Sequence, residues 1–216
     1  QITSFAFGDS VEHIPAHLCN GMNNLTSVTI PISVTSIADW AFQNCSALTS
    51  ITISERVTSI GEYSFNGCTA LTSIIWNATD YSTWDKTNHC PVSPFYEIRS
   101  QITSFIFGEK VEHIPAAICC GMKNLTSVTI PNGVTFIGNK AFSGCFSLTS
   151  VIWNAKEYTG YFQNYSDAPF YDARSNVTSF TFGDSVEYIP NYLCYKMDKL
   201  YGGYYGITIQ KNFVEV

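Results

Sequence analysis

One short sequence pattern returns along almost the whole chain, and it restricts the possible fold more than any other feature. Most copies begin with an aliphatic residue followed by Thr-Ser, and successive copies are mostly 23 residues apart. Copies start at Ile2, Leu25, Leu48, Leu71, Ile102, Leu125, Leu148 and Val177, with a degenerate one at Leu200. Such a period predicts a solenoid, in which each repeat forms one coil and stacks on its neighbours.

Each position of the repeat, counted from zero at its start, has a defined character. Positions 0, 3 and 5 are apolar, which predicts a strand with one face turned inward. Position 9 is Val, position 12 is Ile, position 17 is Phe or Cys, and position 20 is Cys or Met in most coils. These residues should stack as buried ladders. We therefore expect a right-handed leucine-rich repeat solenoid over residues 1–201, β-rich, with parallel strands and short helical turns.

Two intervals are longer than 23 residues, and they predict inserts at about 78–100 and 155–176. The two inserts end alike, with Pro-Phe-Tyr at 94–96 and at 169–171. A shared ending favours a structural role, with Phe95 and Phe170 plugging the solenoid.

The middles of the inserts differ and are rich in aromatic residues, which suit binding hot spots or stacking against sugars. The same residues could instead cap the widened coils, and the sequence leaves both interpretations open. The candidate binding residues are Tyr81, Trp84, His89, Tyr158, Tyr161, Phe162 and Tyr165.

The unit at 125–145, LTSVTIPNGVTFIGNKAFSGC, combines Ile-Pro, Ala-Phe and Gly-Cys marks that resemble the BspA-like leucine-rich repeat. That family is typical of surface proteins of Bacteroides-type bacteria. The resemblance implies export, an extracellular or cell-surface location, and adhesion to host proteins or other bacteria. The chain opens in mid-pattern at Gln1, so we expect a mature or truncated segment without its targeting sequence.

The eight cysteines invite a disulfide framework, but the repeat favours another interpretation. Six of them occupy ladder positions where Phe or Met also occurs, which predicts buried thiols that act as small apolar residues. Cys90 and Cys120 lie outside these ladders. No C-x-x-C motif is present, so a zinc or redox site is not expected.

Nothing in the sequence predicts catalysis. No nucleophile elbow, phosphate-binding loop or zinc-protease motif occurs. His13 and His113 share one repeat position, which becomes Tyr188 in a later coil, and the carboxylates are scattered over turns. We expect a protein that is not an enzyme and has no metal or cofactor.

The charge limits the possible partners. The net charge of −6 and the pI near 5.1 argue against nucleic acid and an anionic membrane surface. No apolar run is long enough to suggest insertion into a membrane.

Three functions remain open. The first is an interaction or adhesion module that binds a protein partner through loops or through the concave sheet face, where small hydroxyl residues are interrupted by Ile75, Ile106 and Ile152. The second is a glycan-binding module that uses the insert aromatics, with a ligand of host origin in either case. The third is a passive spacer. The tail at 202–216 is a C-terminal cap with a strand at 207–209, or the start of an absent region.

Overall fold

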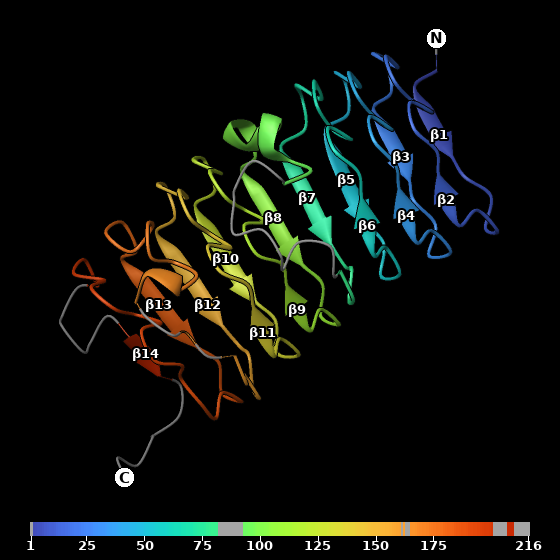
Figure 1. The fold of residues 1–216 in the computed structure, drawn as a ribbon. Coiled ribbons are helices and arrows are strands. Elements are labelled where there is room, and N and C mark those ends of the chain that lie inside the picture. The colour runs from blue at the N-terminus through green and yellow to red at the C-terminus, as the bar shows by residue number, and fades with distance from the viewer. Residues whose placement is uncertain (1, 82–92, 161, 163–164, 201–206, 210–216) are drawn as a thin grey trace.

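The computed structural model describes residues 2–81, 93–160, 162, 165–200 and 207–209, and shows a continuous solenoid (Figure 1). The strands follow one another in chain order, with the two termini at opposite ends of the molecule. The prediction of a β-rich leucine-rich repeat solenoid is confirmed.

The longer strands form the main row. Each pairs in parallel with a strand of the neighbouring coil, for example Ser127 with Ser150, 23 residues later. The main row is divided into three sheets of order β1-β3, β5-β7-β8 and β10-β12-β13-β14. Its strands are β1 Ser4–Ala6, β3 Ser27–Thr29, β5 Ser50–Ile53, β7 Ser73–Trp76, β8 Ser104–Phe107, β10 Ser127–Ile130, β12 Ser150–Trp153, β13 Ser179–Phe182 and β14 Ile207–Ile209.

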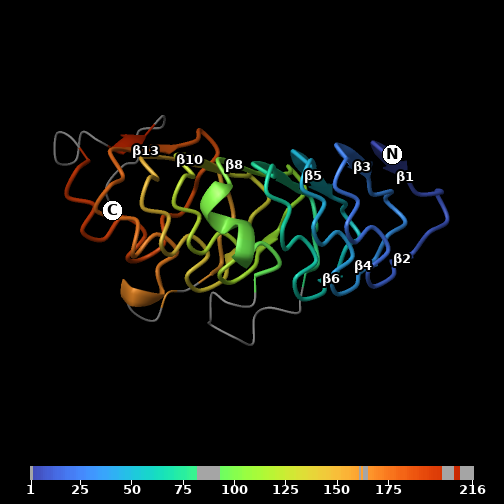
Figure 2. The same ribbon diagram turned by 90° about the horizontal axis from the view of Figure 1, so that it is seen from above.

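A second row of two-residue strands runs along the opposite long side of the solenoid (Figure 2). It forms the sheets β2-β4-β6 and β9-β11. Its strands are β2 His13–Ile14, β4 Ser36–Ile37, β6 Ser59–Ile60, β9 His113–Ile114 and β11 Phe136–Ile137. The helical elements are the short 3-10 helices η2 (Tyr96–Gln101) and η3 (Tyr165–Asp167), and no helix of the described residues is long and apolar enough to cross a membrane.

The space between the two rows is filled by the predicted ladders. Val34 and Val57 at position 9 and Phe42 and Phe65 at position 17 are fully buried. Phe95 continues the phenylalanine ladder, with its ring centroid 5.3 Å from that of Phe65. In the second insert Phe170 stacks on Phe142 at 4.9 Å in the same way, which confirms the structural role predicted for the shared insert endings.

The cysteine ladder consists of free thiols, as the sequence predicted: Cys19, Cys45, Cys68, Cys119, Cys145 and Cys194. The Cys145 thiol donates a hydrogen bond to the carbonyl of Cys119 at 3.1 Å. Burial raises the pKa of Cys145 to about 12, so the ladder is un-ionised at neutral pH. Cys120, which lies outside the ladder, is disulfide-bonded, and Cys90 falls outside the described residues.

Each complete turn uses two residues in the left-handed region of φ. Position 19, with φ between 54° and 76°, is Gly in four coils, Asn in one and Lys in one. Glycine suits this conformation because it has no Cβ. Position 15 is also left-handed, with φ between 54° and 64°, yet none of its described residues is Gly: they are His17, Trp40, Tyr63, Ala117, Lys140 and Tyr192.

The last strand departs from the period expected from the sequence. Phe180 pairs with Ile207, which lies 27 residues later instead of 23. A repeat starting at Leu200 would have paired Phe180 with residue 203, so the interpretation of Leu200 as a repeat start is wrong by four residues. Leu200 is buried and closes the coil of β13 instead.

Candidate interaction surfaces

The insert residues proposed as binders divide sharply by exposure. Tyr81 and Tyr158 are each 4% exposed and Phe162 is 2% exposed. Tyr81 packs edge-on against Trp76 at 4.9 Å, and Tyr158 against Trp153 at 5.2 Å. These three rings cannot reach a ligand in this conformation, which corrects their selection as binding residues.

Their role is to close the widened coils. The backbone N–H of Ile60 donates a hydrogen bond to the Tyr81 hydroxyl at 3.1 Å. Tyr158 occupies the equivalent position in its own coil, and burial raises the pKa of its hydroxyl. The sequence missed this because a ring in an insert carries no periodic mark of the face on which it lies.

The other proposed binders are Trp84, His89 and Tyr161, which lie outside the described residues, and Tyr165. Tyr165 is 46% exposed and belongs to a cluster of tyrosines near the C-terminal end. It stacks on Tyr195 at 5.2 Å, and Tyr192 meets Tyr195 edge-on at 6.0 Å.

The outer face of the main row is the largest regular surface, and its side chains match the sequence expectation. Small hydroxyl residues dominate it, but position 4 holds Ile75, Ile106 and Ile152, which we call the isoleucine row. Ile75 pairs with Ile106, and Thr129 with Ile152. Ile106 is 52% exposed and Ile152 is 40% exposed, so an apolar strip lies within a hydroxyl-rich face.

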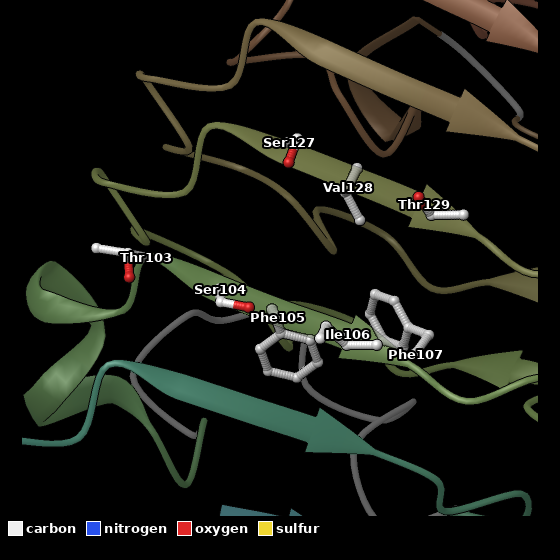
Figure 3. Close-up of a pocket in the computed structure, with 8 residues that line it drawn as sticks. All are labelled: Thr103, Ser104, Phe105, Ile106, Phe107, Ser127, Val128 and Thr129. Carbon is white, nitrogen blue, oxygen red and sulfur yellow. The ribbon is translucent and has the colours of Figure 1, made fainter. Parts of the chain in front are cut away.

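A groove crosses this face between β8 and β10 (Figure 3). These two strands lie in different sheets, so no ladder of hydrogen bonds draws them together. The groove has a volume of about 140 Å³. Its lining combines hydroxyl and apolar side chains: Thr103, Ser104, Phe105, Ile106, Phe107, Ser127, Val128 and Thr129.

A second exposed surface lies on the turns of the first three coils and was not predicted. His17, Trp40 and Tyr63 form a run of near-parallel rings that we call the turn stack. Centroids are 5.0 Å apart for His17–Trp40 and 6.4 Å for Trp40–Tyr63, with interplanar angles of 9° and 5°. The available signal was the shared position 15, which was not examined because it is not apolar throughout.

The described residues contain no group of three His, Cys, Asp or Glu side chains that could hold a metal ion. His13, the histidine that recurs as His113, lies with Nδ1 2.8 Å from the Ser36 hydroxyl of the next coil. The surfaces above therefore offer contact area and hydrogen bonds instead of a reactive centre.

Parallel coils, apolar ladders and a short-strand second row define the class of the protein, a leucine-rich repeat solenoid. More narrowly, the chain belongs to the BspA-type leucine-rich repeat family. The model described as "BspA type Leucine rich repeat region (6 copies)" matches residues 1–87 and 88–213. Proteins of this repeat class are in general interaction or scaffold modules without enzymatic activity, and they generally bind proteins.

Several solved structures are similar. A leucine-rich repeat protein from Eubacterium ventriosum is 22% identical with a TM-score of 0.48, over 100% of this chain and 46% of that one. The T. pallidum leucine-rich repeat protein is 20% identical with a TM-score of 0.46, over 88% and 71%. A leucine-rich cell surface protein from Faecalibacterium prausnitzii is 18% identical with a TM-score of 0.38, over 85% and 60%.

The chain thus spans about half the length of the Eubacterium ventriosum protein. No curated protein matches it.

Proposed function

We propose that this solenoid is a non-enzymatic interaction module, displayed on a bacterial surface or secreted, that binds a protein partner through the outer face of its main row. The observation that carries the proposal is the isoleucine row beside the β8–β10 groove. Ile106 and Ile152 expose about half of their side chains there, while the groove interrupts the sheet between them.

The composition of this face supports a protein partner. Interfaces between proteins combine an apolar centre, where charged residues are depleted, with a polar rim. Here the isoleucine row supplies the centre, and hydroxyls such as Ser104, Ser127 and Thr129 surround it. These short side chains lose little conformational freedom on binding.

Family membership supports the location. BspA-type repeats imply export, and the similar Faecalibacterium prausnitzii chain is described as a cell surface protein. Of the 216 residues only 13% are charged, so a large share of the surface is available for uncharged contacts.

The test is a binding screen of the purified chain against immobilised extracellular-matrix proteins by biolayer interferometry. The variant Ile106→Arg with Ile152→Arg places two charges in the proposed centre. For any partner that is found, we expect at least tenfold weaker binding, because each guanidinium must be desolvated in an apolar contact.

The matched control is Phe136→Arg. Phe136 is 38% exposed but lies in β11 of the second row, on the other long side. Its binding should stay within twofold of the parent. A partner whose binding tolerates the double change contradicts the sheet-face assignment, and no partner at all favours a passive spacer.

A further inference from the structure

We propose that the turn stack and the residues beside it form a second binding site, specific for uncharged oligosaccharides. The site lies on the turns of the first three coils, away from the main-row face, and is independent of the protein interaction proposed above. Three repeat positions build it. Position 15 supplies rings, position 18 supplies the amides of Asn20, Gln43 and Asn66, and position 14 supplies Asp39 and Glu62.

The rings are accessible even though they lie against one another. His17 is exposed, Trp40 is half-buried and Tyr63 is 44% exposed. Centroid distances of 5.0 and 6.4 Å at almost parallel planes are in the range of offset stacking, in which neighbouring rings overlap only in part. The stack therefore resembles a short staircase, and apolar C–H faces of a sugar can lie against its uncovered parts.

The amide row is already ordered for hydrogen bonding. The Asn20 amide donates to Oε1 of Gln43 at 3.1 Å, across two coils. The same nitrogen lies 3.1 Å from Nδ1 of His17, so a neutral His17 that accepts there carries its proton on Nε2. An amide offers both donors and acceptors, which matches the hydroxyl groups of a sugar. Groups held in place before binding lower its entropic cost.

The backbone indicates that the rings are retained for a purpose other than stability. A non-glycine residue in the left-handed region costs about 1–2 kcal/mol, and for a bulky residue the conformation is unusual. Position 19 meets the same demand with glycine in four coils, whereas position 15 keeps its rings. At Ala117 the turn is fully buried and the ring is gone.

The charges select among sugars. Residues 2–81 contain six carboxylates but only one Lys or Arg, Arg56. Asp39 and Glu62 lie directly before Trp40 and Tyr63 in the chain, so an anionic ligand would meet like charge. Sialylated or sulfated glycans are therefore disfavoured, while carboxylates accept hydrogen bonds readily from neutral hydroxyls.

The experiment uses the whole chain on an array of maltohexaose, cellohexaose, laminarihexaose, mannohexaose and chitohexaose, with sialylated and sulfated glycans beside them. The best binder is then titrated by calorimetry. The central variant is Trp40→Gly, which removes the middle ring and places at φ 54° a residue that tolerates that angle, so the fold is retained. We expect its association constant to fall at least tenfold.

Two controls locate the effect. Lys140→Gly changes the same repeat position in a coil without the stack, and Tyr192→Gly removes a ring from the C-terminal tyrosine cluster. Both should bind the oligosaccharide within twofold of the parent. Melting temperatures of all variants are compared first, to establish that each is folded.

Three outcomes would overturn the proposal. These are no binding of any uncharged oligosaccharide at millimolar concentration, unchanged binding by Trp40→Gly, and equal or tighter binding of the sialylated or sulfated glycans. Failure here leaves the sheet-face proposal intact, because the double change at Ile106 and Ile152 tests a different surface with a protein ligand.

Discussion

Two aromatic stacks run along the same turns, two residues apart in the sequence, and they differ in almost everything except geometry. Phe42, Phe65 and Phe95 stack at 5.5 and 5.3 Å and are fully buried. His17 and Trp40 stack at 5.0 Å on the outside, and Tyr63 follows at 6.4 Å. The repeat itself generates both, because equivalent residues of neighbouring coils come to lie side by side.

The difference shows that stacking alone does not make a ladder stabilising. A buried ring gains the free energy of leaving water, on the order of 1.5–3 kcal/mol, and then many dispersion contacts. A ring of the turn stack gains only part of this, and its left-handed backbone costs about as much. The inner stack contributes to folding, and the outer stack is left available for a ligand.

The largest expected effect concerns the inner stack. Phe65→Ala should lower the free energy of unfolding by about 3–5 kcal/mol, because the cavity lies between two other rings. Urea unfolding followed by circular dichroism measures it. Tyr63→Ala, two residues away on the same turn, should cost less than about 1 kcal/mol. Equal losses for the two variants would erase the distinction between the stacks.

A smaller effect is expected at the other left-handed position. Gly67 has φ +75°, and a Cβ there would lie 2.2 Å from Oδ1 of Asn44. Gly67→Ala should therefore cost about 1–2 kcal/mol in the same unfolding measurement. Gly8→Ala is the control, since nothing lies within 4 Å of a Cβ at Gly8. A loss at Gly8 as large as that at Gly67 would count against backbone conformation as the cause.

The thiol ladder predicts a pH dependence in the core beside the inner stack. The pKa of Cys145 is raised from 9.0 to about 12 in the folded protein. Below pH 9 both states keep the proton, and stability is unaffected. Between pH 9 and 12 the unfolded chain loses it first, so stability falls as pH rises, by roughly 1 kcal/mol at pH 10 for this thiol.

Unfolding midpoints at pH 8 and pH 10 measure this dependence. The variant Cys145→Ala should be less stable at pH 8 but should lose less between the two pH values than the parent. An identical loss in both proteins would show that Cys145 does not cause the dependence.

The smallest expected effect on stability belongs to the turn stack. Trp40→Gly loses partial stacking but relieves the left-handed strain, so its unfolding free energy should stay within about 1 kcal/mol of the parent. Differential scanning calorimetry is suited to so small a change. A loss of 3 kcal/mol or more, as expected at Phe65, would make the turn stack part of the core.

Most of the fold could be predicted because it is periodic. Each ladder residue is confirmed by its equivalents in other coils, so Phe65 or Cys145 did not have to be interpreted alone. The free thiols followed from the same logic, since Cys shares its positions with Phe and Met. Phe95 and Phe170 were placed correctly because the two inserts end alike.

Where the period fails, prediction failed with it. Tyr81 and Tyr158 lie within inserts, where no repeat position distinguishes an inward ring from an outward one, and both turned out to be buried. The final strand at 207–209 follows a tail in which the pattern fades, so its register could not be counted from Leu200. The β8–β10 groove depends on how two strands separate, which residue types alone do not reveal.

The turn stack was missed for a different reason. Position 15 varies among His, Trp, Tyr, Ala and Lys, and an analysis guided by apolar ladders passes over such a position. Only the shared left-handed backbone and the parallel rings make its residues a group.

The interruptions of the main row are staggered against those of the second row, like joints in brickwork. Where β3 and β5 separate, β4 and β6 still pair, and where β8 and β10 separate, β9 and β11 still pair. The coils at the groove are thus joined along one edge and open along the other, as the leaves of a book are joined at the spine. Slight bending about β9 and β11 would widen the groove without parting the coils, and amide hydrogen exchange faster in β10 than in β12 would reveal it.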